Sequence, residues 1–171
     1  AIKETCSECS IPAYVERSRS GNGAHVWMFF KEAVSAGMAR KLGSAIITAT
    51  LDRRHQIGLD SYDRLFPNQD TMPKGGFGNL IALPLQKQSR EQGNSVFLDE
   101  ELNPVEDQWS WLASFKRIGP AKLSQYISEL TARHGAAGML AEADQEEIPP
   151  WEHKVPASEE YEDLPAQANV V

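Results

Sequence analysis

The chain has 171 residues, of which 41% are hydrophobic, and a formal net charge of −7. This length suits one domain with a modest core, and the acidic balance argues against a generally basic, nucleic-acid-binding surface. The sequence has no signal-peptide pattern and no run of about 18 apolar residues, so we expect a cytoplasmic protein that makes no contact with a membrane.

Charge is spread unevenly along the chain. Basic side chains gather in the first half, between Arg17 and Lys74, and acidic ones gather late, from Glu142 to Asp163. Because binding of phosphates depends on local field and not on net charge, we expect any surface for nucleotides or nucleic acid in the first half. Alternatively, both clusters are ordinary solvated surfaces without a binding function.

The predicted elements begin with a helix over residues 1–9, which carries Cys6 and Cys9 in a C-x-x-C spacing. No second pair follows that would complete a zinc site, and no strand precedes the motif as in a thioredoxin-like protein. We therefore expect two free thiols.

Alternation of Ile11, Ala13 and Val15 with the residues between them predicts a strand. Residues 24–30 are rich in β-forming side chains and predict a second strand, joined to the first by a Gly-containing hairpin turn.

Apolar residues at helical spacing then predict an amphipathic helix over 34–53. Short strands are expected over 62–66, 79–85 and 95–98, and helices over 107–118 and 120–134. The sequence thus predicts an α+β domain over 1–138, with an antiparallel sheet of about four or five strands and helices on one side. Residues 139–171 are acidic and proline-containing without periodicity, which predicts a disordered linker or tail.

The segment between the first two strands carries the richest chemistry. Its residues are Arg17, Ser18, Arg19, Ser20, Gly21, Asn22 and Gly23, followed by His25. Glycines let backbone N–H groups approach a phosphate, hydroxyls add donors, and arginines pair with phosphate oxygens. The same turn could serve only to close a hairpin. It is not a P-loop, because no Lys-Ser/Thr pair and no helix follow the glycines.

Two further segments could contribute to a site. Asp60, Asp63 and Asp70 lie near a predicted strand, where carboxylates could hold magnesium ions, although Asp is equally common in plain turns. Lys74 precedes a glycine-rich loop at 75–78 and could contact phosphate, or the loop could be only a connection.

In order, SRSGNGAHVWMFF, DSYDRLFPNQD and KGGFGNLIALPLQ resemble the primase domain of TOTE conflict-system proteins, a family of the archaeo-eukaryotic primase superfamily, over roughly residues 10–100. The resemblance implies the RNA-recognition-motif-like half of a primase core. It implies that His25 contacts the phosphates of an incoming NTP or dNTP, with Ser20 and Arg19 nearby, and that Asp63, or alternatively Asp70, is a catalytic carboxylate. Asp63 would be the metal ligand.

The resemblance further implies Mg²⁺ or Mn²⁺, a DNA or RNA template-primer, a two-metal transfer to a 3′-hydroxyl, and a helicase fused or encoded nearby. The sequence departs from the family in one respect, because no Asp-x-Asp on a hydrophobic strand precedes SRSGNGAH. The chain is then either a fragment or a degenerate remnant, and we expect it not to polymerise alone. The alternative is a non-catalytic module that binds nucleotide or single-stranded nucleic acid.

Overall fold

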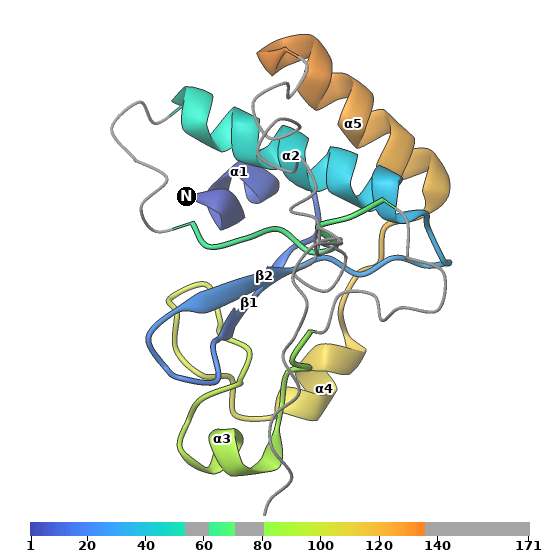
Figure 1. Cartoon of the computed structure of the whole chain (residues 1–171). Coiled ribbons are helices and arrows are strands. Elements are labelled where there is room, and N and C mark those ends of the chain that lie inside the picture. The colour runs from blue at the N-terminus through green and yellow to red at the C-terminus, as the bar shows by residue number, and fades with distance from the viewer. Residues whose placement is uncertain (54–61, 71–80, 136–171) are drawn as a thin grey trace, which may run out of the picture.

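The computed structural model describes residues 1–53, 62–70 and 81–135 (Figure 1). These residues form helices and one strand pair, in the order α1 (Ile2–Glu8), β1 (Tyr14–Arg17), β2 (Ala24–Trp27), α2 (Ala36–Arg53), α3 (Lys87–Glu91), α4 (Gln108–Ala113) and α5 (Pro120–His134). The combination confirms the predicted α+β class. Within the described ranges, no helix is long and apolar enough to span a lipid bilayer.

Strands β1 and β2 form an antiparallel hairpin in which Glu16 lies opposite His25 and Arg17 opposite Ala24. The connection is closed by two backbone hydrogen bonds: Ser18 N donates to Gly23 O at 2.8 Å, and Gly21 N donates to Ser18 O at 3.0 Å. Side chains alternate between the two faces of a strand. The hairpin therefore presents two faces of different character.

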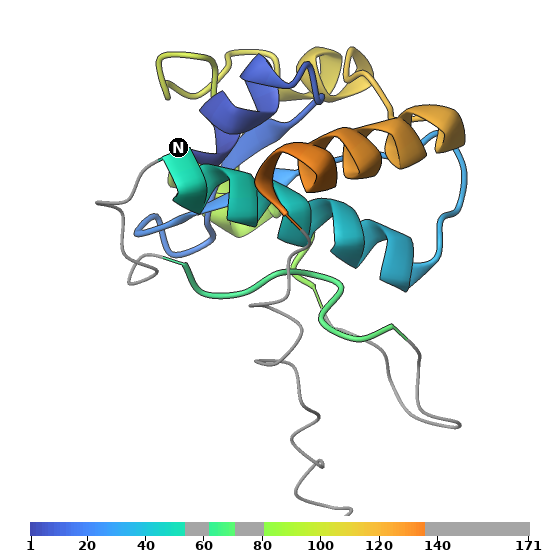
Figure 2. The same cartoon turned by 90° about the horizontal axis from the view of Figure 1, so that it is seen from above.

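One face packs against helices α1, α2 and α5, which lie together on that side of the hairpin (Figures 1 and 2). Helix α2 contributes the largest share of this core because its apolar residues recur at helical spacing, and Leu42 and Ile46 are fully buried. Burial of one such side chain contributes roughly 1.5–3 kcal/mol. The buried members of this core are Cys6, Ile11, Ala13, Leu42, Ala45, Ile46, Ala49, Ile118, Leu123 and Leu130.

Polar contacts hold α1 and α5 against α2. Buried Thr50 Oγ1 donates to Thr5 Oγ1 at 3.0 Å, which links α2 to α1. His134 Nδ1 lies 2.7 Å from Asp52 Oδ2, which links the ends of α5 and α2.

The other face of the hairpin carries aromatic side chains. Tyr14 stacks on Phe115 with ring centroids 3.6 Å apart, and Phe97 meets Phe115 edge-on at 4.9 Å. Trp27 and Phe29 of the second strand and its extension pack against the same cluster. Helices α3 and α4 lie on this side (Figure 1).

Helix α4 begins at a well-formed cap. The Asp107 carboxylate accepts hydrogen bonds from the backbone N–H groups of Trp109 at 3.1 Å and Ser110 at 3.0 Å. The Ser110 hydroxyl also donates to it at 2.6 Å. These hydrogen bonds, first that of the Ser110 hydroxyl, lower the pKa of Asp107 because they favour its charged form.

A segment at 93–97 runs along the outer edge of β1. Arg17 N donates to Val96 O at 2.9 Å, and Phe97 forms an isolated antiparallel bridge with Glu16. On its far side, the side-chain amide of Gln108 replaces a further strand: Phe97 N donates to Gln108 Oε1 at 2.7 Å, and Gln108 Nε2 donates to Phe97 O at 2.9 Å. The buried Gln108 side chain thus satisfies both the backbone N–H and the backbone C=O of Phe97.

Several predicted elements are confirmed: the N-terminal helix, the hairpin, and the helices at 34–53, 107–118 and 120–134. The helix predicted at 107–118 is shorter than expected, and α3 was not predicted. Parts of other predictions lie outside the described residues. They are Asp60, residues 79 and 80, Lys74 with the glycines at 75–78, and the tail at 139–171.

The strands predicted over 62–66 and 79–85 are wrong for the residues described, because neither 62–66 nor 81–85 forms a strand. Leu65 packs instead on helix α2 at Gly43, where an added Cβ would lie 2.6 Å from Leu65 Cδ1. Leu85 has a φ of +62°, which interrupts an extended chain.

The residues expected to form a strand at 95–98 make only isolated bridges. Ser95, with a φ of +53°, departs from extended geometry. Among the described residues, the sheet therefore has two strands where four or five were expected.

Candidate functional site

The connection between β1 and β2, residues Ser18–Gly23, forms an exposed loop that we call the glycine loop. Ser18 Oγ accepts a hydrogen bond from Gly23 N at 3.1 Å and lies 3.1 Å from Ser20 Oγ. Asn22 N lies 3.4 Å from Ser20 Oγ. The serine side chains therefore shape the loop from within, and the Ser20 hydroxyl lies at its exposed tip.

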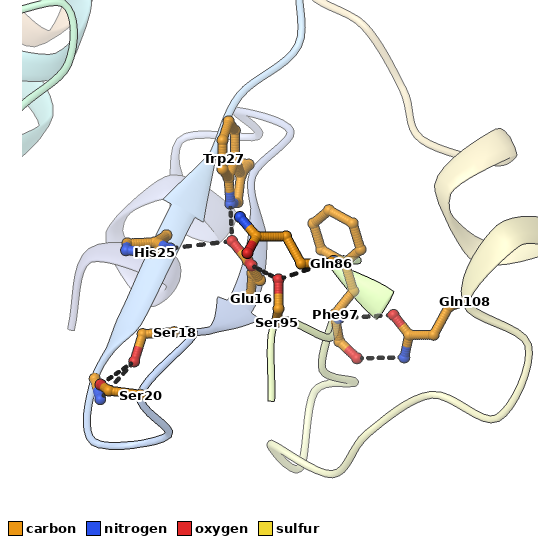
Figure 3. Close-up of polar contacts among 10 residues, drawn as sticks. Glu16, Ser18, Ser20, His25, Trp27, Gln86, Ser95, Phe97 and Gln108 are labelled. Atoms are coloured by element: carbon orange, nitrogen blue, oxygen red, sulfur yellow. Dashed lines mark hydrogen bonds and ion pairs between the residues drawn. The ribbon is translucent and has the colours of Figure 1, made fainter. Parts of the chain in front are cut away.

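His25 stands next to the glycine loop, at the second position of β2. Its side chain is 49% exposed, and its Nδ1 lies 3.0 Å from Glu16 Oε2. The edge of the Trp27 ring approaches the His25 ring with centroids 6.3 Å apart. One ring nitrogen thus faces the protein, and the other points away from Glu16 (Figure 3).

Glu16 is buried, with 2% of its side chain exposed. Its carboxylate accepts a hydrogen bond from Trp27 Nε1 at 2.6 Å and one from Ser95 Oγ at 3.0 Å, in addition to its contact with His25 (Figure 3). A buried carboxylate is costly unless hydrogen bonds satisfy it. Here three side chains from two separate parts of the chain do so.

The segment at 93–97 also supports the glycine loop directly. Ser95 N lies 3.4 Å from Ser18 O, and the Arg17 guanidinium donates to Gly93 O at 3.1 Å. The Asn94 side chain lies so close to Gly21 that an added Cβ at Gly21 would be 2.8 Å from Asn94 Oδ1. Gly21 has a φ of +81°, so glycine is required at this position for conformation as well as for space.

The two arginines of the motif differ in their surroundings. Arg17 is half-buried and held by Gly93, whereas Arg19 is exposed at the loop and has no ion pair within the described part of the chain. A hydroxyl, a guanidinium and an imidazole thus lie around one small loop, whose N–H groups at Gly21 and Gly23 are already bonded to Ser18. Such a set of donors suits an anion with several oxygen atoms, such as a phosphate chain.

The predicted carboxylates lie elsewhere. Asp63 is 84% exposed and pairs with its neighbour Arg64 at 3.3 Å. Asp70 is 64% exposed and pairs with Arg40 of α2 at 3.1 Å. No contact links either of them to His25 in the described ranges.

A metal site does not emerge from these groups. In the parts of the chain that the structure covers, no three His, Cys, Asp or Glu residues lie close enough together to hold an ion. A pair of magnesium ions needs several carboxylate oxygens. The described residues therefore do not fit a two-metal centre by themselves, and the metal-binding role of Asp63 stays a prediction, as does the role of Lys74, which lies outside the described residues.

Cys6 and Cys9 are free thiols. Cys6 is fully buried in the helical core, and this burial raises the pKa of its thiol to about 12 because a thiolate would lose its hydration. The pair does not belong to the site around His25.

Sequence reasoning missed Glu16, Ser95 and Asn94. A signal existed for Glu16, because the predicted alternation places it on the polar face of its strand, and the hairpin register then brings it opposite His25. No comparable signal existed for Ser95 and Asn94, which reach the site through the fold.

The chain is similar to a known protein family. Residues 1–126 match the family model described as the TOTE conflict system, Archaeo-Eukaryotic Primase domain. No curated protein sequence matches the chain.

Proposed function

Because the chain belongs to the archaeo-eukaryotic primase domain family of TOTE conflict systems, we propose that its glycine loop and His25 bind the triphosphate of an incoming NTP or dNTP. The observation that carries the proposal is the grouping of anion-binding donors on one exposed turn. The loop, Arg19 and the outward nitrogen of His25 all lie at the same end of one hairpin. The family membership supports nucleotides and nucleic acid as the substrates.

Each residue of the motif has a distinct role in this proposal. Arg19 and Ser20, which are exposed, donate to phosphate oxygens from the side chains of the loop. Ser18 and Asn22 shape the loop through hydrogen bonds inside it.

Arg17 contributes through its charge, since one of its N–H groups already donates to Gly93 O. His25 reaches the phosphates with the ring nitrogen that points away from Glu16. Lys74 adds a further positive charge.

The family also supports a role in nucleotidyl transfer to a 3′-hydroxyl on a DNA or RNA template-primer. Mg²⁺ or Mn²⁺ would neutralise the triphosphate and assist the leaving group in such a reaction. The sequence contains no Asp-x-Asp, and Asp63 and Asp70 are the candidate carboxylates. We therefore propose that this polypeptide binds nucleotide but does not extend a primer by itself.

The test is calorimetric titration of the purified chain with ATP and dATP in the presence of Mg²⁺. A charge-assisted hydrogen bond contributes roughly 1.5–3 kcal/mol, so Arg19→Ala and His25→Ala should each raise the Kd by about 10-fold or more. Arg117→Ala is the matched control, since Arg117 is exposed beside Ile118, which bonds to Phe29 beyond the end of β2 that lies away from the loop. Wild-type affinity in both site variants would refute the assignment, and template-dependent extension by this chain would refute its inactivity.

A second candidate function is the binding of single-stranded nucleic acid without chemistry. One observation favours it: Trp109 is exposed, and the Arg90 guanidinium lies 5.5 Å from the centroid of its ring. Exposed aromatic and arginine side chains can stack on nucleic-acid bases. Binding of an oligonucleotide that weakens with salt and with Trp109→Ala, yet ignores His25→Ala, would favour this function.

A further inference from the structure

Glu16 is an unusual residue for its position. The neighbouring side chains on its face of the hairpin are aromatic, among them Tyr14 and Trp27, and they pack into an apolar cluster. A carboxylate at 2% exposure in such surroundings carries a desolvation cost that a hydrophobic side chain would not. Packing of the hairpin does not require it, so its contacts need another explanation.

The contact with His25 constrains the imidazole. A deprotonated carboxylate only accepts hydrogen bonds, so His25 Nδ1 must carry the proton that lies between it and Glu16 Oε2, 3.0 Å away. The outward nitrogen, Nε2, then has a lone pair when the ring is neutral and an N–H when the ring is an imidazolium. His25 can donate to a phosphate oxygen and keep its bond to Glu16 only in the imidazolium form.

Glu16 itself is fixed from two further directions. Trp27 Nε1 donates to the oxygen that also faces His25, and Ser95 Oγ donates to the other oxygen. Since the carboxylate cannot rotate without breaking one of these bonds, the direction of the imidazole is set by the fold (Figure 3). This is the arrangement by which a buried acid selects the tautomer and orientation of a histidine.

The charged groups around His25 are few. Glu16 faces it from β1, and the segment at 93–97, which supports Glu16, contains no charged side chain. Arg17 and Arg19 lie toward the glycine loop, on the side where the phosphates would bind.

We infer that Glu16 is a positioning residue, which holds His25 with Nδ1 protonated and Nε2 directed outward, so that His25 meets the triphosphate as an imidazolium between two anions. The inference rests on the proposed function, because it assumes that His25 contacts the nucleotide. It adds a residue that acts only through His25 and does not touch the ligand.

The test is a double-mutant cycle on ATP affinity. Glu16→Leu removes the acceptor with a side chain of similar size, and we expect it to raise the Kd by about 10-fold, as His25→Ala does. The variant with both substitutions should bind no more weakly than His25→Ala alone. If Glu16→Leu weakens binding equally in the presence and absence of His25, Glu16 is only structural and the inference is overturned.

Glu16→Gln provides the conservative variant and keeps the test valid if the leucine variant fails to fold. The glutamine carbonyl can still accept from His25 and Trp27, while its NH₂ group faces Ser95 Oγ, whose hydroxyl can accept. We expect its ATP affinity to lie between those of wild type and Glu16→Leu. Affinity equal to or below that of His25→Ala would contradict an orienting role.

Nitrogen-15 NMR of the His25 ring gives a readout that a structural role would not move. In the free wild-type chain, Nδ1 should be protonated, and on addition of ATP both nitrogens should be. In Glu16→Leu both neutral tautomers should be populated. If the ring responds to ATP and carries a proton on Nε2 alone, the inference is refuted and the proposed function stands. If the ring does not respond to ATP and His25→Ala leaves the ATP affinity unchanged, the proposed function is refuted.

Discussion

Gln108 offers a sharp test of how the segment at 93–97 is held against the hairpin. Its side chain is buried and makes three hydrogen bonds: it accepts from Phe97 N at 2.7 Å and donates to Phe97 O at 2.9 Å and to Val105 O at 2.7 Å. Gln108→Ala removes all three. Phe97 O keeps a bond from Val105 N at 3.1 Å, but Phe97 N loses its acceptor within a buried region.

The expected loss follows from these contacts. Each hydrogen bond contributes roughly 1 kcal/mol net, and a buried donor left unpaired adds to the cost. We therefore expect Gln108→Ala to lower the free energy of unfolding by about 3 kcal/mol, which corresponds to a fall in Tm of roughly 6–12 °C for a chain of this size.

Urea denaturation followed by tryptophan fluorescence and circular dichroism measures this change. Gln88→Ala is the control, because Gln88 is an exposed residue of α3, and its substitution should change stability by less than about 0.5 kcal/mol. If Gln108→Ala costs less than about 1 kcal/mol, water replaces the amide without penalty and the side chain is not a substitute for a strand.

Two further predictions concern a thiol and a glycine. Burial raises the pKa of Cys6 to about 12. An alkylating reagent at pH 8 should therefore modify the less buried Cys9 first and reach Cys6 only on unfolding, which mass spectrometry can follow. Equal rates of modification at the two thiols would contradict the burial of Cys6. Gly21 and Gly135 both have a φ of +81°, but an added Cβ meets Asn94 only at Gly21. Gly21→Ala should therefore reduce stability and ATP affinity more than Gly135→Ala, by thermal denaturation and calorimetry, and equal effects would show that the contact with Asn94 is unimportant.

Elements stabilised by their own local pattern could be predicted from the sequence. Helix α2 follows from apolar residues at helical spacing, and α5 begins with Pro120 at its first position, where proline needs no hydrogen-bond donor. The hairpin follows from alternation before a glycine-containing turn and from β-forming residues after it. These elements also place the glycine loop and His25 next to each other, which is why half of the candidate site could be inferred without a structure.

Elements that depend on distant contacts could not be predicted in this way. Residues 62–66 have the composition of a short strand, but Leu65 finds a partner on α2 because Gly43 leaves room for it. Residues 95–98 lie beside β1, as a third strand would, yet they form only isolated bridges. Side-chain packing in the first case, and the side-chain amide of Gln108 in the second, outweighs an intrinsic preference that is weak for short strands.

Glu16 combines a feature that the local pattern predicts with one that depends on distant contacts. The alternation of its strand identifies the face that it occupies, and an acidic residue on such a face is ordinarily solvated. It is buried here because the segment at 93–97 covers it, and that segment is held by Ser95 within the site and by Gln108 outside it. Apart from Lys74, the residues that would face a nucleotide are therefore encoded in one contiguous motif. The direction of His25 depends in addition on Ser95, which lies about eighty positions beyond Glu16 along the chain.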